Sequence, residues 1–243
     1  MKLKSYTSLF IIVLIINACK KDPQIKPVSF PDATYQSLAP YDSKGQPDNL
    51  LTDIISPDLV TYVNQMLVDR NNLTISHPEL FTGANPADIP VNQSSDVFVT
   101  FVFGNAGNSN TLGFYTYPTG QPPTSDKDVK LITYIFPNAG VNSPLKAGDK
   151  MYLGKFNVGT TIGFVILQNA WDTSKSFINS DATHFCSTDA LNPEMDPKLK
   201  RHAVVLDYSG GQKLIGFEDR NRASLDCDQD FNDIVFYCTV TPN

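Results

Sequence analysis

The sequence contains few of the residues that build disulfide frameworks: only four of its 243 residues are cysteines. Cys19 lies at the end of an N-terminal apolar segment, which leaves Cys186, Cys227 and Cys238 for the folded part of the chain. Three thiols can form at most one intrachain disulfide, which excludes a domain held together mainly by disulfides. Because the leader predicts export to an oxidising compartment, we expect a disulfide from Cys186 to Cys227 or to Cys238.

Histidine is also scarce, with three in the chain, and this limits the zinc sites that could form. A zinc site could be built from His184 and the cysteines Cys186, Cys227 and Cys238, with or without His202, but the spacing His184-Phe185-Cys186 fits no compact zinc motif. For His202, a structural role is favoured over that of a catalytic base, because no nucleophile is evident beside it in the sequence.

Several motifs of nucleotide-binding proteins and hydrolases are absent from the sequence. There is no Walker motif, no dinucleotide-binding glycine pattern and no serine nucleophile elbow. Strands do not alternate with helices, which excludes a doubly wound nucleotide-binding sheet. The formal net charge is −6 at pH 7, and a negative balance disfavours nucleic acid as a partner.

The N-terminus has the features of a lipoprotein signal peptide. Lys2 and Lys4 precede the apolar run 9–16, which is too short to span a bilayer but long enough for the core of a signal peptide. The sequence Ile16-Asn17-Ala18-Cys19 follows, with a small residue directly before the cysteine. We therefore expect residues 1–18 to be a signal peptide and Cys19 to carry a lipid that holds the protein at a membrane.

The segment after Cys19 is polar and is interrupted by five prolines, which predicts a flexible tether over residues 19–50. Together with the signal peptide, this segment predicts an outer-membrane lipoprotein, on the cell surface or on the periplasmic face. The sequence does not decide between these two locations. The remaining residues, 51–243, are predicted to form one domain.

Residues 51–243 have the pattern of an all-β domain with one helix. Ser56-Pro57-Asp58 is typical of a helix start, and Leu59, Val63, Met66 and Leu67 follow at helical spacing. From residue 96 onward, eight apolar segments alternate with period two and are separated by turn residues. They predict an antiparallel two-sheet β-sandwich, similar to a jelly roll, with strands at 96–103, 111–117, 129–136, 151–156, 161–168, 202–208, 213–217 and 234–240.

An acidic segment near the C-terminus is the strongest chemical signal in the sequence. Six carboxylates lie within the sixteen residues from Glu218 to Asp233. Like charges this close repel one another unless a cation neutralises them. All candidate ligands are oxygens, which suit Ca²⁺ better than Zn²⁺ or Cu²⁺. We expect Glu218 and Asp219 to end one strand and the acids around Asp230 to precede the next, so that one ion ties the two strand ends together.

The acidic segment is not an EF-hand. Asp226, Asp228 and Asp230 match the opening of such a loop, but its sixth position is Phe231 and its twelfth is Tyr237. A solvated acidic turn without any ion is the alternative interpretation.

Several elements of the sequence, taken in order, resemble the LruC-type domain and the related domain of unknown function 4114. The most specific are Gly216-Phe217-Glu218-Asp219 and the segment from Asp228 to Asp233. The weaker elements are residues 110–118, 136–139, 153–154, 161–164, 169–171 and 201–204.

The resemblance implies a secreted or surface-attached, largely β protein with a calcium site, and it does not imply any catalytic activity. The residues that match the family's carboxylate motif are Glu218, Asp219, Asp228, Asp230, Asn232 and Asp233. The chain departs from the family at Gly104-Asn105-Ala106-Gly107, where the family often has an acidic residue.

Taken together, these features predict a non-enzymatic, calcium-binding surface module for adhesion or binding, with an extracellular protein or a glycan as its partner. One alternative is a structural or assembly subunit of a surface layer or fibre. Another is a carbohydrate-active enzyme. The enzyme is disfavoured because the acids are bunched in one segment and do not face each other across a cleft, as a glycosidase requires.

Overall fold

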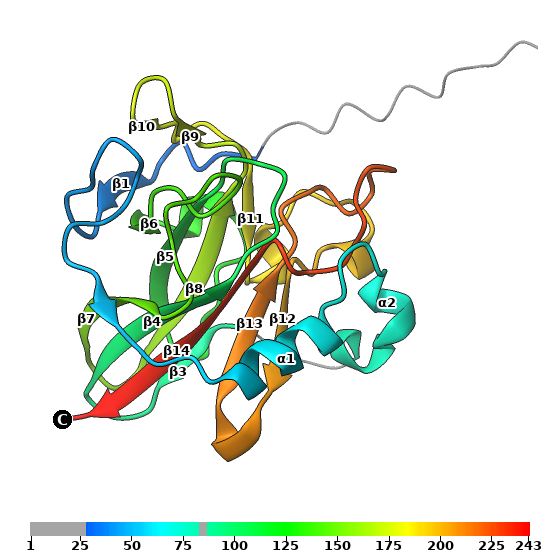
Figure 1. Cartoon of the computed structure of the whole chain (residues 1–243). Coiled ribbons are helices and arrows are strands. Elements are labelled where there is room, and N and C mark those ends of the chain that lie inside the picture. Colours follow the sequence, from blue (N-terminus) through cyan, green and yellow to red (C-terminus); the bar gives the residue numbers. More distant parts are fainter. Residues whose placement is uncertain (1–27, 83–86) are drawn as a thin grey trace, which may run out of the picture.

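The computed structural model describes residues 28–82 and 87–243, and these form two stacked β-sheets with helices at one side (Figure 1). The predicted signal peptide, Cys19 and the start of the predicted tether lie outside the described residues. Within the described residues, no helix is both long and apolar enough to cross a membrane.

The first sheet has six strands, all paired antiparallel. Their order across the sheet is β12 (Ala203–Asp207), β13 (Lys213–Phe217), β14 (Ile234–Pro242), β4 (Ser95–Phe103), β7 (Asp149–Phe156) and β2 (Leu51–Thr52).

The second sheet also has six strands, and it contains one parallel pair, β1 with β6. The order is β1 (Thr34–Ser37), β6 (Leu131–Phe136), β5 (Thr111–Pro118), β8 (Thr160–Leu167) and β11 (His184–Cys186), and β3 (Ile89–Val91) pairs with the other end of β8. The short hairpin β9 (Trp171–Asp172) and β10 (Phe177–Ile178) stands apart. The 3₁₀ turns are η1 (Pro78–Phe81), η2 (Asp126–Asp128), η3 (Asp189–Leu191), η4 (Pro197–Leu199) and η5 (Ser209–Gly211).

The main core lies between the two sheets and follows from the alternation in the strands. In β4, Val97, Val99 and Phe101 are buried in this core, whereas Phe98 packs beside Tyr152 on the other face. Aromatic rings join the layers, and Phe164 of β8 meets Phe236 of β14 at 4.9 Å between ring centroids. The prediction of an all-β, antiparallel two-sheet sandwich is therefore confirmed.

The predicted N-terminal helix is α1 (Pro57–Met66), and it covers the outer face of the first sheet (Figure 1). Ser56 caps it, because its Oγ accepts a hydrogen bond from the backbone N–H of Leu59 at 3.2 Å. Leu59 and Val63 pack against apolar side chains of β12, β13 and β14. A second, shorter helix, α2 (Leu73–Ser76), follows it and was not predicted.

The predicted tether over residues 19–50 is wrong for its described part, residues 28–50. Phe30 has 0% exposure and stacks on the ring of His184 at 4.8 Å. Residues of β1 then pair with β6 in the second sheet. The prolines interrupt any regular alternation of apolar and polar residues in this segment, so the sequence did not predict a strand. A few buried aromatic side chains are nevertheless enough to hold the segment against the sandwich.

The predicted disulfide is also wrong, because Cys186, Cys227 and Cys238 are all free. Cys186 is fully buried on β11 in the cluster around Phe30, whereas Cys238 on β14 packs against the core between the sheets. Burial raises the pKa of the Cys186 thiol well above its usual value, and this makes the thiol unreactive.

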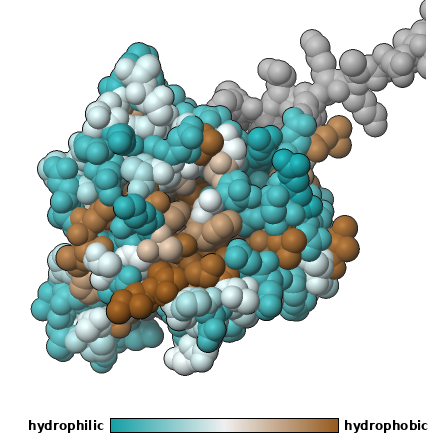
Figure 2. Space-filling view, viewed as in Figure 1, coloured by the Kyte–Doolittle hydropathy of each residue, from teal (hydrophilic) through white to brown (hydrophobic). Residues whose placement is uncertain are grey.

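The face shown in Figure 2 is hydrophilic over most of its area, and it carries a hydrophobic band across its lower middle and several smaller hydrophobic patches. The segment that leads into α1 lies in this part of the face, and it exposes Leu51 and Ile54. Scattered apolar side chains of this kind are normal on a protein surface.

Candidate metal site

The pairing of β13 with β14 brings the acidic residues together. These strands are antiparallel neighbours, and Phe217 at the end of β13 is opposite Ile234 at the start of β14. Residues directly after β13 therefore lie beside residues directly before β14. The backbone N–H of Asp233 donates to the carbonyl of Phe217 at 3.2 Å and closes this end of the strand pair.

The loop before β14 has an unusual backbone that depends on one buried ring. Gln229 and Phe231 both have positive φ, at 59° and 57°. This conformation is costly for a bulky residue, so the surroundings must stabilise it. Phe231 is completely buried and packs on the ring of Phe81 at 5.2 Å between centroids. Asp228 and Asn232 flank these two left-handed residues in the sequence, and Asp230 lies between them.

The six residues predicted as ligands all lie in this one region, but they differ in burial. Glu218 and Asp219 are each only 1% exposed, and Asp230, Asn232 and Asp233 are buried as well. Asp228 is exposed to solvent. Carboxylate groups this deeply buried are rare without a compensating charge.

The carboxylates form two groups that share Glu218. One consists of Glu218, Asp228 and Asp230, and the other of Glu218, Asp219 and Asp233. In each group, one oxygen from every residue lies within 4.8 Å of the others. One ion could be bound by oxygens from three residues in either position.

Neutral donors orient these carboxylates, and the positive charge of Arg220 offsets the negative charge only in part, by lowering the pKa of Asp219. Asp219 accepts hydrogen bonds from the side-chain amides of Asn108, at 2.9 Å, and Asn110. Asp233 accepts from the backbone N–H of Asp219 at 2.7 Å. Asp230 accepts from the backbone N–H of Arg70 at 2.8 Å.

Asn232 positions a neighbouring acid through its amide nitrogen. Its Nδ2 donates to the carboxylate of Asp230 at 3.0 Å, and its backbone N–H donates to the same side chain at 3.1 Å. Asn232 also lines the cavity. The carbonyl oxygen of this amide is the atom that could face an ion.

Glu218 holds the one carboxylate oxygen in these groups that is buried without any partner. Its Oε1 accepts from the backbone N–H of Arg220 at 3.2 Å. Its Oε2 has no hydrogen-bond donor. An ionised, buried oxygen without a donor is unfavourable unless another group binds it.

Burial and mutual repulsion shift the protonation of the whole cluster. Burial, followed by the charges of Asp219, Asp228 and Asp230, raises the pKa of Glu218 from 4.5 to about 8. Burial also raises the pKa of Asp233 well above its usual value, and the charges of Asp219 and Glu218 add to this effect. The cluster therefore holds its negative charge only at a cost in free energy, and a divalent cation would remove that cost.

The residues present fit a hard cation. The carboxylates surround a cavity of about 510 Å³. Its lining also includes Asp69, Asn105 and Asp226, and no histidine or cysteine. In the described part of the chain, the residue groups compact enough for a metal contain carboxylates only, so the alternative zinc site does not form.

His202 contacts the backbone of the site and has a structural role there. Its ring is fully buried, stacks on Phe185 at 4.2 Å, and lies 2.9 Å from the carbonyl of Glu218 through Nδ1. Its Nε2 lies 2.9 Å from the carboxylate of Glu194. With both ring nitrogens engaged, His202 fixes the backbone that carries Glu218.

Asn108 and Asn110, whose side chains donate to Asp219, were not predicted from the sequence as site residues. They lie more than one hundred positions before Asp219, in and beside the turn that leads into β5. Only the packing of the second sheet against the first brings them to the acidic loop.

Comparison with known proteins finds one family model, which covers the region that holds the six predicted ligands. A family model described as "Domain of unknown function (DUF4114)" matches residues 156–241, which run from the end of β7 into β14 and include the entire acidic loop. No curated protein and no solved structure matches the chain. Over residues 156–241, the chain is therefore similar to the domain of unknown function family DUF4114.

Proposed function

We propose that this domain binds Ca²⁺ through the acidic loop and acts as a non-enzymatic binding or adhesion module at the cell envelope. The observation that carries the calcium site is Oε2 of Glu218, which is buried and lacks a donor, on the residue that both carboxylate groups share. A bound cation would give this oxygen a partner, and it would offset the repulsion between the neighbouring carboxylates.

Calcium is the cation that this donor set favours. The side chains that line the cavity offer oxygen ligands from several carboxylates and from amides. Ca²⁺ accepts six to eight oxygens in a flexible geometry, whereas Mg²⁺ requires a near-ideal octahedron and retains several waters. Ligands that come from two strand ends and an irregular loop suit the more tolerant ion.

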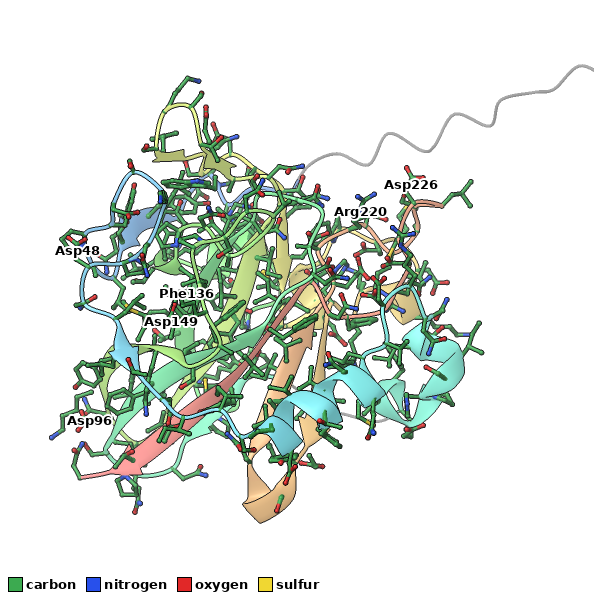
Figure 3. All side chains as sticks on the ribbon, in the orientation of Figure 1. Asp48, Asp96, Phe136, Asp149, Arg220 and Asp226 are labelled. Atoms are coloured by element: carbon green, nitrogen blue, oxygen red, sulfur yellow. The ribbon has the colours of Figure 1, made fainter. Side chains whose placement is uncertain are left out.

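The position of the loop supports a role in binding a partner. An ion held by Glu218, Asp228 and Asp230 would cross-link the end of β13 to the loop before β14. The tip of this loop extends from the molecule, and Figure 3 shows Arg220 and Asp226 there, at the edge away from the sheets. Leu225 at this tip is 95% exposed. A rigid, exposed loop loses less conformational entropy on binding than a mobile one.

The proposed setting of the module comes from the sequence. The lipid on Cys19 would hold the domain at the outer membrane, on the cell surface or on the periplasmic face, and the loop would meet an extracellular protein or a glycan. The negative net charge argues against nucleic acid.

Calcium titration calorimetry on the wild type and two matched variants tests the proposed ion site. Glu218→Gln keeps the shape of the central side chain and removes its charge, whereas Asp207→Asn removes a charge from an exposed position outside both carboxylate groups and outside the cavity lining. We expect Glu218→Gln to weaken calcium binding by at least about tenfold, because changes outside the ligand shell alone cost that much. Asp207→Asn should bind like the wild type. Wild-type protein that takes up no calcium would refute the site.

The binding role needs a second measurement. Panels of glycans and extracellular proteins should be screened with calcium-loaded protein and with the same protein in EDTA. We expect any specific partner to be bound by the loaded form and released by EDTA. A partner bound equally well under both conditions would show that adhesion does not depend on the ion.

A further inference from the structure

A second cavity lies apart from the acidic loop and shares none of its lining residues with it. Its volume is about 430 Å³, within the range of small-molecule sites. It is formed by β3, the turn after β5 and the segment between β11 and β12. Much of the wall is apolar, with Pro90, Pro122, Pro123 and Ala190 among its residues.

Asp88 lies in this cavity as a buried carboxylate held by neutral donors. It is 6% exposed and accepts hydrogen bonds from the hydroxyls of Tyr117, at 2.5 Å, and Thr188, at 2.7 Å, and from the hydroxyl of Ser187. These hydroxyls fix the carboxylate but do not neutralise it. No cation forms an ion pair with Asp88 in the part of the chain that the structure describes.

The donors around Asp88 are themselves fixed by the sandwich. Thr188 accepts a hydrogen bond from the buried hydroxyl of Tyr115 at 2.7 Å. Ser187 accepts from the backbone N–H of Phe164 at 2.7 Å. The carboxylate is therefore preorganised by β5 and β8. An ionised carboxylate offers about four acceptor positions, and three hydroxyls leave about one for a ligand.

The cavity as a whole is negative. Its other acid, Asp189, is paired with the guanidinium of Arg201 at 3.4 Å, and Arg201 also donates to the carbonyl of Leu80 at 3.0 Å. Burial raises the pKa of Asp189, and the charge of Asp88 contributes to that rise. Two carboxylates and one guanidinium leave a net charge of about −1 when all are ionised.

We infer that this cavity binds a small primary amine, with the protonated amino group on Asp88 and a short apolar stem along the proline wall. An ammonium compensates the buried charge of Asp88 and donates to its remaining acceptor position. The net charge excludes anions. In the described part of the chain, Asp88 belongs to no compact group of three metal-ligating side chains, which disfavours a bare divalent cation. Polyols are disfavoured because their hydroxyls would leave the charge of Asp88 uncompensated.

Calorimetric titration with 1,4-diaminobutane tests this site, with 1,4-butanediol as the uncharged analogue of the same length. Asp88→Asn removes the charge, but the loss of this buried anchor can prevent folding. Ala190→Trp instead fills the cavity from an exposed position on its wall, and Ala147→Trp places the same ring on another exposed loop as the control.

We expect the diamine to bind the wild type and Ala147→Trp saturably in the millimolar range or below, and Ala190→Trp at least about tenfold more weakly. The diol should not bind, and EDTA should change nothing because the acidic loop is not involved. The inference is overturned if the wild type fails to saturate, if the diol binds as well as the diamine, or if Ala190→Trp binds like the control.

Discussion

Glu218→Gln should have opposite effects on stability with and without calcium. In EDTA, the wild type must keep the Glu218 carboxyl in a buried site where its pKa is raised from 4.5 to about 8. The folded protein therefore binds more protons than the unfolded chain between these values, so this group's contribution to stability falls as the pH rises from 4.5 to 8. Each pKa unit corresponds to about 1.4 kcal/mol, so the loss between pH 5 and pH 8 is at most about 4 kcal/mol.

Urea unfolding at pH 5 and pH 8, followed by circular dichroism, measures this effect directly. In EDTA at pH 8, Glu218→Gln should be more stable than the wild type, and at pH 5 the difference should shrink. In millimolar Ca²⁺ at pH 8, the order should reverse, because the ion stabilises only the protein that retains the charged ligand. The reasoning is refuted if the two proteins show the same change with pH in EDTA, or if calcium leaves their order unchanged.

Three further predictions follow from the packing around the site and the core. Phe231→Ala should lower the free energy of unfolding by about 3–5 kcal/mol in chemical denaturation, because it empties a buried ring site and frees the left-handed loop; a change below 1 kcal/mol would contradict this. Asn110→Ala should weaken calcium binding about tenfold or more in calorimetry, because Asp219 loses a donor that lowers its pKa; unchanged affinity would place Asp219 away from the ion. Phe30→Ala should destabilise the fold by about 3–5 kcal/mol, whereas a flexible tether would lose less than about 0.5 kcal/mol.

The strands that the sequence predicts are the long ones with a clear alternation. All eight predicted segments correspond to observed strands, from β4 to β14, because each buries one face against the opposite sheet. The short strands β1, β3 and β11 were missed. They have three or four residues each, and β3 contains Pro90, so no period could be recognised.

The acids of the candidate site could be predicted for a similar reason. They flank two strands that are adjacent in the sequence, and such strands usually pair. The sequence did not predict which of these acids are buried. Asp226 and Asp228 are exposed, whereas Asp230 is buried because of the turn at Phe231. The contribution of Asn108 and Asn110 depends on contacts between distant segments, which a pattern in one segment does not contain.

The most direct test of the calcium site is thermal unfolding of the chain in EDTA and in millimolar Ca²⁺, beside the double variant Asp228→Ala/Asp230→Ala. An ion that binds only the folded state at a hundredfold excess over Kd stabilises it by about 2.7 kcal/mol. We predict a clear rise in Tm with calcium for the wild type and none for the variant. Equal Tm values for the wild type in EDTA and in calcium would contradict the site and leave the acidic loop without a bound ion.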